Sequence, residues 1–352
     1  MFPLAFPYTI LRNHGRPGQW VLDPFCGRGT TNYAGRLLGM PSIGIDSSPV
    51  AVAIAQAKLA NTSPAAIVRA ARRILAEVPA PGVVPEGEFW VWAFEASVLR
   101  LLCRLREGLL RNCRSDARIA LRAILLGALH GPRPKHRQSY FSNQAPRTYA
   151  PKPRYAVKFW RAHQMTPELV DVIALIEERA HRYYGPSTQV PEGAVMRADS
   201  RLPETFTHLA AGKPVNWVIT SPPYYGMRTY LPDQWLRSWL LGGPDSVEYS
   251  MAGQLTHASP ESMTAQLRQV WRNAGAHAAP GARLIARFGG INDRKADPLT
   301  IITHSLAETG WEITGIEPAG AASAGRRQAA HFGRAKQSAI EEHDIWASWI
   351  SS

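Results

Sequence analysis

The sequence predicts an α/β fold: a mostly parallel, seven-stranded sheet interrupted by a mainly helical insertion. At both ends of the chain, short apolar runs alternate with helical patterns, which is typical of a parallel sheet. Between residues 61 and 190 that alternation gives way to amphipathic helical patterns. The 352 residues are 45% hydrophobic and 19% charged, a globular composition that can bury a sizeable core.

The first part of the sheet is expected within residues 1–60. Trp20–Asp23 and Ser42–Asp46 are short apolar runs that each end in an acid. Helical patterns follow over Thr30–Leu38 and Pro49–Leu59. The second pattern has its proline near the start, where the missing N–H is tolerated.

The insertion, residues 61–190, is expected to bind DNA and recognise the target, and contains four expected amphipathic helices: Ala65–Glu77, Glu95–Arg111, Ala117–Leu129 and Pro167–Tyr184. Between the last two, the stretch from His130 to His163 holds eight Lys/Arg and no Asp or Glu. Its prolines predict an extended, irregular segment. Six aromatic residues interleave with the basic ones and can stack on bases or pack the segment down.

The α/β alternation resumes in residues 191–352, which we assign with residues 1–60 to one catalytic domain. Helices are expected over Ser262–Ala278 and Pro298–Thr309. The expected strands are Ala194–Ala198, Val215–Thr220, Ala282–Phe288, Trp311–Glu317 and His343–Ile350. Between the last two strands, Ala319–Lys336 is rich in small residues, carries four Arg/Lys and no acid, and is expected to be a mobile loop that could add a second contact to a nucleic-acid backbone.

Charge points to a polyanionic partner. Forty Lys/Arg against 27 Asp/Glu give a net charge of +13, and the basic stretch supplies more than half of it. No apolar run is long enough to span a membrane and no signal peptide is evident, so a cytoplasmic, nucleoid-associated protein is expected. Three cysteines without a CxxC pair, and histidines without a zinc spacing, predict neither a disulfide framework nor a metal site.

The first chemical motif is DPFCGRGTT, Asp23 to Thr31. A strand, then Gly27 and Gly29, then a helix make a tight turn that lets a nucleotide-like ligand approach the main chain. Asp46 ends the next strand, where a carboxylate can bind ribose hydroxyls. A P-loop is excluded, and Asn32 breaks the dinucleotide pattern. An acidic turn suits a cationic ligand such as S-adenosylmethionine, with Asp23 near its ammonium group.

The second motif is TSPPYY, Thr220 to Tyr225, directly after an apolar strand. Its two prolines remove N–H donors and leave carbonyl oxygens to accept hydrogen bonds. An exocyclic amine of a base needs such acceptors, and Tyr224 can stack on the base. The fourth core strand is expected beside the first, so that Asp23 and Ser221 face one crevice.

Together the two motifs resemble those of the S-adenosylmethionine-dependent DNA amino methyltransferases, which modify cytosine N4 or adenine N6. The resemblance covers about residues 1–60 and 190–350 and implies a Rossmann-like class I methyltransferase fold. It implies that Asp199 holds the adenine ring of the cofactor. The implied cofactor-binding residues are Asp23, Pro24, Phe25, Cys26, Gly27, Gly29, Thr30, Asp46, Ser47 and Asp199. The implied catalytic residues are Ser221, Pro222, Pro223 and Tyr224.

The expected substrate is an exocyclic amine of a base flipped out of double-stranded DNA. The resemblance implies that serine before Pro-Pro-Tyr favours cytosine N4 over adenine N6, because the adenine enzymes of that family more often carry Asp or Asn there. The absence of a Pro-Cys step argues against cytosine C5 chemistry. An RNA or protein N-methyltransferase and an inactive nucleic-acid-binding relative remain alternatives, and a cognate restriction endonuclease is a possible partner. The expected DNA-binding residues are Arg133, Lys135, Arg137, Arg147, Lys152, Arg154 and Lys158.

Overall fold

The computed structural model describes residues 2–131, 139–143, 152–185, 190–207, 213–226, 234–247, 259–290, 296–321 and 341–350. The chain forms two compact units. The first consists of Met1–Leu59, Val190–Thr229 and Ala252–Ser352, and the second of Ala60–Gln189 and Tyr230–Met251.

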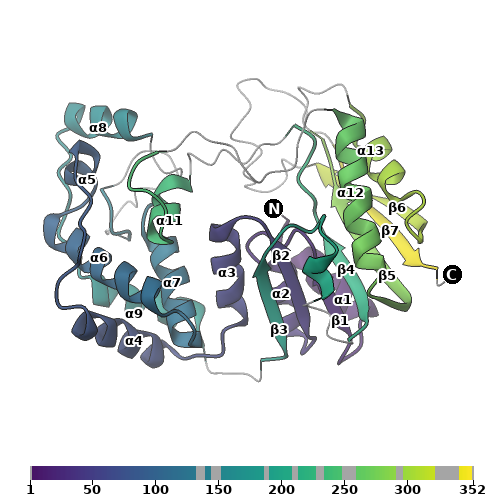
Figure 1. Ribbon diagram of the computed structural model, residues 1–352, viewed down its shortest axis with the longest axis horizontal. Coiled ribbons are helices and arrows are strands. Elements are labelled where there is room, and N and C mark those ends of the chain that lie inside the picture. Colours follow the sequence, from purple (N-terminus) through teal and green to yellow (C-terminus); the bar gives the residue numbers. More distant parts are fainter. Residues whose placement is uncertain are drawn as a thin grey trace. The chain divides into compact units, whose positions relative to one another are not determined.

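The first unit is built on a seven-stranded sheet (Figure 1). Its strands are β1 (Trp20–Asp23), β2 (Ser42–Asp46), β3 (Gly193–Arg197), β4 (Val215–Thr220), β5 (Ala278–Phe288), β6 (Trp311–Ala321) and β7 (Glu341–Trp349). They lie in the order β3-β2-β1-β4-β5-β7-β6, and β7 runs antiparallel to both of its neighbours. This is the Rossmann-like, mostly parallel arrangement of a class I methyltransferase, so the predicted fold is confirmed.

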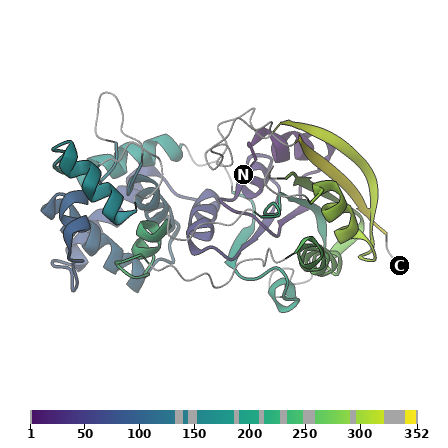
Figure 2. The same ribbon diagram turned by 90° about the horizontal axis from the view of Figure 1, so that it is seen from above.

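Helices cover both faces of this sheet because its strands are apolar on both sides. In β1, Val21 packs with α1 (Ala5–His14) and α2 (Thr30–Leu37), while Leu22 belongs to the opposite core. That opposite core contains α12 (Pro260–Gly275) and α13 (Pro298–Leu306), seen on the other side of the sheet in Figure 2. The remaining helices are α3 (Pro49–Leu59), which packs against β2 and β3, and the short α10 (Glu204–Thr207).

The second unit is helical wherever the structure describes regular elements in it. Its helices are α4 (Pro64–Glu77), α5 (Glu88–Ala93), α6 (Ala96–Arg111), α7 (Asp116–Ala128), α8 (Pro153–Ala162), α9 (Val172–Tyr183) and α11 (Trp235–Leu240). Side-chain caps begin four of them: Ser63, Glu95, Ser115 and Asp171 accept hydrogen bonds from backbone N–H groups of the first turn. The aromatic core includes Trp90, which contacts both Trp235 and Trp239.

The structure differs from the sequence analysis in several elements, including the unexpected helix α5 and the later start of α9. The basic stretch is not irregular throughout, because residues 153–162 form α8 with Pro153 in its first turn, where proline is tolerated. Residues 230–251, expected in the catalytic domain, cluster with the helical unit. The first residues of the segment expected to be a loop, 319–321, belong to β6, which continues to Ala321. Residues 322–340 lie outside the described residues.

Candidate active site

The two chemical motifs meet at the carboxyl ends of β1 and β4, which are neighbouring parallel strands. Asp23 ends β1 and Thr220 ends β4. The Thr220 hydroxyl donates a hydrogen bond of 2.6 Å to Asp23 Oδ1. The Thr31 hydroxyl, in the first turn of α2, donates to the Ile219 carbonyl at 3.2 Å. Because these bonds cross between the motifs, the turn after β1 and the start of the Pro-Pro-Tyr loop are held together.

The turn after β1, residues 24–29, is shaped by backbone hydrogen bonds and by left-handed glycines. Cys26 N–H donates to the Ile45 carbonyl at 2.9 Å, and Gly29 N–H donates to the Cys26 carbonyl at 2.7 Å. Gly27 and Gly29 have φ angles of +52° and +69°, where residues with a Cβ are strained. A Cβ on Gly29 would also lie 2.7 Å from the Cβ of Ala55 in α3. Both glycines are therefore required by the main-chain path.

Asp23 is the most unusual group of the site. Its side chain is fully buried, and burial raises its pKa to about 6, although the hydrogen bond from Thr220 opposes this rise. Oδ1 also accepts from Phe25 N–H at 3.1 Å. Oδ2 is buried and has no hydrogen-bond partner among the described residues. An unsatisfied carboxylate oxygen suits a cationic donor such as an ammonium group.

Asp46, at the end of β2, braces the same turn from the other side. Its Oδ2 accepts from Gly27 N–H at 2.9 Å and its Oδ1 from Ser48 N–H at 2.8 Å. Burial raises the pKa of Asp46, while these two backbone donors lower it. The neighbouring Ser47 is exposed. Each carboxylate oxygen retains a free lone pair, so the group can also accept from a ribose hydroxyl.

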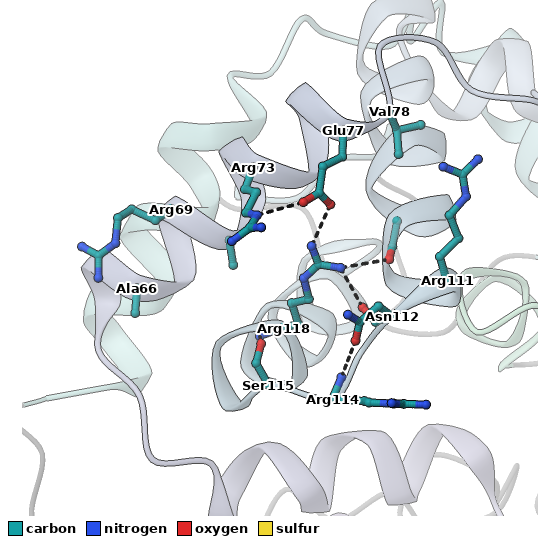
Figure 3. Close-up of a pocket in the computed structure, with 12 residues that line it drawn as sticks. Ala66, Arg69, Arg73, Glu77, Val78, Arg111, Asn112, Arg114, Ser115 and Arg118 are labelled. Atoms are coloured by element: carbon teal, nitrogen blue, oxygen red, sulfur yellow. Dashed lines mark hydrogen bonds and ion pairs between the residues drawn. The ribbon is translucent and has the colours of Figure 1, made fainter.

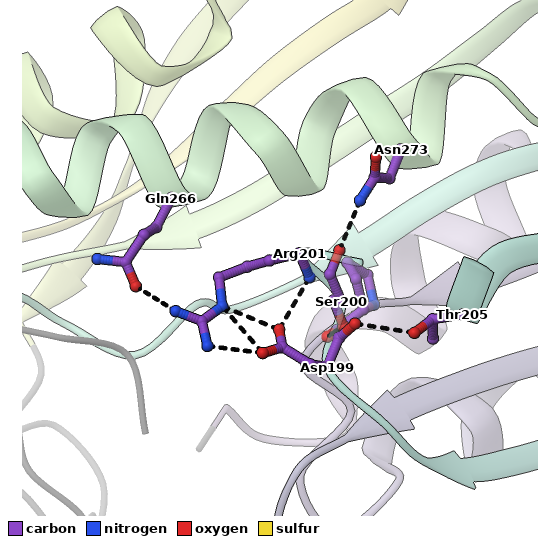
Figure 4. A network of polar contacts seen from close by, with 7 residues as sticks. Asp199, Ser200, Arg201, Thr205, Gln266 and Asn273 are labelled. Carbon is purple, nitrogen blue, oxygen red and sulfur yellow. Dashed lines mark hydrogen bonds and ion pairs between the residues drawn. The ribbon is translucent and has the colours of Figure 1, made fainter. Parts of the chain in front are cut away.

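The predicted adenine ligand, Asp199, lies two residues after β3 in a polar network (Figure 4). Arg201 binds its carboxylate bidentately, with the shortest N–O distance 2.6 Å, and this pairing lowers the pKa of Asp199. Arg201 also donates to Gln266 Oε1 at 2.7 Å. Sequence reasoning missed Arg201, although its position two residues after Asp199 was visible.

The loop of Asp199 is attached directly to the turn after β1. The Ser200 hydroxyl donates to the Pro24 carbonyl at 2.6 Å, and the amide of Asn273 in α12 donates to the Ser200 carbonyl at 3.1 Å (Figure 4). Thr205 donates to the Asp199 carbonyl at 2.9 Å. The predicted cofactor residues after β1, β2 and β3 therefore lie along one edge of the sheet.

Tyr224 of the Pro-Pro-Tyr loop is held more tightly than the sequence indicates. Its side chain is 7% exposed, and its hydroxyl donates to Oε1 of the buried Glu342 in β7. Its ring makes an edge contact with Phe288, with centroids 5.6 Å apart. Ser221 and Pro223 are partly exposed. Sequence reasoning missed Glu342 because 118 residues separate it from Tyr224.

Cys26, one of the implied cofactor-binding residues, is packed in the core. It is 5% exposed and clusters with Val52, Ala55 and Val195. Burial raises the pKa of its thiol well above the ordinary range, which disfavours the reactive thiolate. Among the described residues, no group of three or more His, Cys, Asp or Glu side chains could hold a metal ion.

The predicted DNA-binding residues are only partly within the described chain. Lys152 precedes α8, and Arg154 and Lys158 lie on it; all three are exposed. Trp160 on the same helix is fully buried, so aromatic residues of the stretch contribute to packing. The predicted residues Arg133, Lys135, Arg137 and Arg147 lie outside the described residues.

Comparison with known proteins agrees with the first motif. Residues 1–57 match the N6_N4_Mtase family model, described as DNA methylase. That segment contains Asp23, Gly27, Gly29 and Asp46 but not the Pro-Pro-Tyr loop. None of the curated proteins matches this chain. No described helix is long and apolar enough to cross a membrane.

Similar solved structures are methyltransferases of low sequence identity. The chain is 12% identical to the rRNA methyltransferase aviRa from Streptomyces viridochromogenes, with a TM-score of 0.37 and coverage of 99% of this chain and 85% of that one. It is 11% identical to magnesium protoporphyrin IX methyltransferase from Synechocystis PCC 6803, solved with bound SAM, with a TM-score of 0.36 and coverage of 99% of this chain and 78% of that one. It is 10% identical to a SAM-dependent methyltransferase from Methanosarcina mazei, with a TM-score of 0.36 and coverage of 100% of this chain and 99% of that one.

Such low scores support no conclusion about substrate, and the fold assignment rests on the order of the strands. The chain has the fold of the class I S-adenosylmethionine-dependent methyltransferases, and its first 57 residues carry the pattern of the DNA methylase family.

Proposed function

We propose that this protein methylates an exocyclic amine of a base in double-stranded DNA, with cytosine N4 as the favoured target. The observation that carries the proposal is the junction of the two motifs. Asp23 and Thr220 share a hydrogen bond at the ends of adjacent parallel strands. Ser221 is the next residue after Thr220, so the Pro-Pro-Tyr loop starts beside the turn that would bind the cofactor. Cofactor and substrate loops must adjoin in this way for a direct group transfer.

The cofactor residues fit S-adenosylmethionine by charge and by main-chain shape. Oδ2 of Asp23 is an acceptor without a partner among the described residues and would hold the ammonium group. Asp46 would accept from the ribose, and the turn at Gly27 and Gly29 admits the ligand to the backbone. The cofactor supplies a methyl group on a positively charged sulfur. Asp199 would hold the adenine ring, and Arg201 orients its carboxylate.

The target amine would be handled by the Pro-Pro-Tyr loop. The carbonyls of Ser221 and Pro222 accept the hydrogens of the amine, which frees its nitrogen lone pair for attack. The proton leaves once the nitrogen is cationic, so no strong general base is needed. Tyr224 would stack on the flipped base. Because its ring is only 7% exposed here, stacking requires the ring to become more accessible.

The experiment is methyl transfer with isotope-labelled S-adenosylmethionine, duplex DNA and a matched RNA transcript, followed by mass spectrometry of the nucleosides. N4-methylcytosine from DNA is the expected product. N6-methyladenine would keep the mechanism and change the base, as the second candidate. Label in RNA alone, or cofactor binding without any transfer, would overturn the DNA methyltransferase assignment.

Tyr224 is tested by a pair of variants. Tyr224→Ala removes the ring and should lower the rate on DNA by about 5- to 150-fold, equivalent to about 1–3 kcal/mol of base stacking. Tyr224→Phe keeps the ring and removes the hydroxyl that donates to Glu342, so it should retain most activity. Cofactor affinity, measured by calorimetric titration, should be similar in both. Equal loss of activity in two folded variants would assign Tyr224 a structural role instead.

A further inference from the structure

The helical unit contains a cavity of about 840 Å³, and five of the twelve residues that line it are arginines (Figure 3). It lies among α4, α6 and α7, outside both the basic stretch and the residues 1–57 that match the family model, and none of its residues is among the predicted DNA-binding residues. Its charged lining consists of Arg69, Arg73, Arg111, Arg114, Arg118 and Glu77. Five guanidinium groups against one carboxylate make the lining strongly cationic.

The single carboxylate is already neutralised. Glu77 accepts from Arg73 Nε and from Arg118 Nη2, each at 2.8 Å, and these bonds lower its pKa. Arg118 is also fixed by the carbonyl of Asn112, to which Nη1 donates at 3.0 Å. With its side chain only 12% exposed, Arg118 is a structural support of the cavity. Because Glu77 is already paired with Arg73 and Arg118, it does not compete with an incoming anion for the remaining arginines.

Two of those arginines are available. Arg69 on α4 and Arg114 before α7 are exposed, and neither guanidinium has a partner among the residues that the structure describes. Arg111 pairs with Glu107, which is outside the lining. In Figure 3 the side chains of Arg69, Arg111 and Arg114 point in different directions around the cavity.

This spread decides which anion fits. A site for one phosphate needs donors that converge within hydrogen-bond distance of a single group. Guanidinium groups that diverge along the rim instead match charges repeated along an extended polyanion. Residues 60–189 carry 20 Lys/Arg against 10 Asp/Glu, so the surroundings of the cavity reinforce the same preference.

We infer that this cavity contacts the phosphate backbone of the DNA substrate, through Arg69 and Arg114 in particular. The inference rests on the proposed function, because it takes DNA as the substrate. It places a contact on α4 and α7, in addition to the one expected of the basic stretch. Backbone contacts of this kind add affinity and orientation without reading sequence.

The test compares two double variants of the full chain with equal loss of charge. Arg69→Gln with Arg114→Gln removes the two available groups of the cavity. Arg72→Gln with Arg100→Gln removes two exposed arginines of α4 and α6 that do not line it. Arg118 is left intact because it supports the fold. Affinity for one DNA duplex is measured across a series of salt concentrations, and circular dichroism checks folding.

The cavity variant should flatten the plot of log affinity against log salt by about 1.8 units, that is about 0.9 for each lost contact. The control variant should change the slope by much less. Equal slopes for cavity and control variants would overturn the inference. So would a cavity variant whose slope is unchanged but which loses stabilisation by inorganic phosphate, since that marks a small-anion site. Methylation of DNA by the wild type, measured alongside, shows separately whether the proposed function stands.

Discussion

Among single residues, Asp23 has a buried carboxylate whose charge opposes folding. Its folded pKa is about 6 against an ordinary 3.8, because its carboxylate is buried. The folded state therefore binds a proton more readily than the unfolded state between these values. Stability contributed by the protonated form is fully present below pH 4 and is lost as pH rises through 6. Above pH 7 the buried charge costs about 3 kcal/mol.

Asp23→Asn should therefore stabilise the cofactor-free protein by about 1–3 kcal/mol at pH 8 and change little at pH 4. Urea denaturation at both pH values measures this. Asp297→Asn is a control of opposite sign, because the Asp297 carboxylate caps α13 and its pKa is lowered. Calorimetry should show that Asp23→Asn also weakens cofactor binding. A gain in stability that is the same at both pH values would rule out charge burial as its cause.

Glycines in the cofactor turn link single residues to the packing of helices. Gly29→Ala should destabilise the protein by about 2–5 kcal/mol, because a left-handed alanine and a contact of 2.7 Å with Ala55 add together. Gly27→Ala is the matched control: its φ is also positive, but its Cβ would meet nothing within 4 Å. It should cost only about 1–2 kcal/mol. Equal losses in urea denaturation would show that the packing of α2 on α3 tolerates the extra methyl group.

At the scale of elements, α8 is the part of the basic stretch whose role can be tested directly. Lys152, Arg154 and Lys158 are exposed along or just before it. Changing all three to Gln should reduce the salt slope of DNA binding by up to about 2.7 units and weaken all sequences alike. Filter binding on two unrelated duplexes measures both effects. An unchanged slope would identify α8 as a solvated surface.

Elements with strong local signals were predictable, and contacts across the sheet were not. The strand–turn–helix of Asp23 to Thr31 follows from local apolar runs and glycines, and Ser63, Ser115 and Asp171 are recognisable caps. By contrast, α8 was missed because proline was taken as a breaker although it stands at the start of a helix. The partners Glu342 and Asn273 join the site only through tertiary packing.

For the whole molecule, the order of motifs predicted the neighbouring strands β1 and β4, because a parallel sheet places a ligand at its switch point. The division of the chain was harder to foresee. Residues 230–251 join the helical unit through core contacts of Trp235 and Trp239, and their short sequence carries no mark of this. The distribution of charge could be read without the structure, because the sequence alone shows that most of the excess of Lys/Arg over Asp/Glu lies within residues 60–189.

The insertion between β2 and β3 also has a consequence for synthesis on the ribosome. Ser42 of β2 pairs with Gly193 of β3, and Trp20 of β1 pairs with Val215 of β4. At about 5–20 residues per second, β2 leaves the ribosome about 7–30 s before its partner. During that interval β1 and β2 offer unpaired edges, while the helices of the insertion can already form from local contacts. Nascent chains are therefore most exposed to edge-to-edge aggregation before residue 215 emerges.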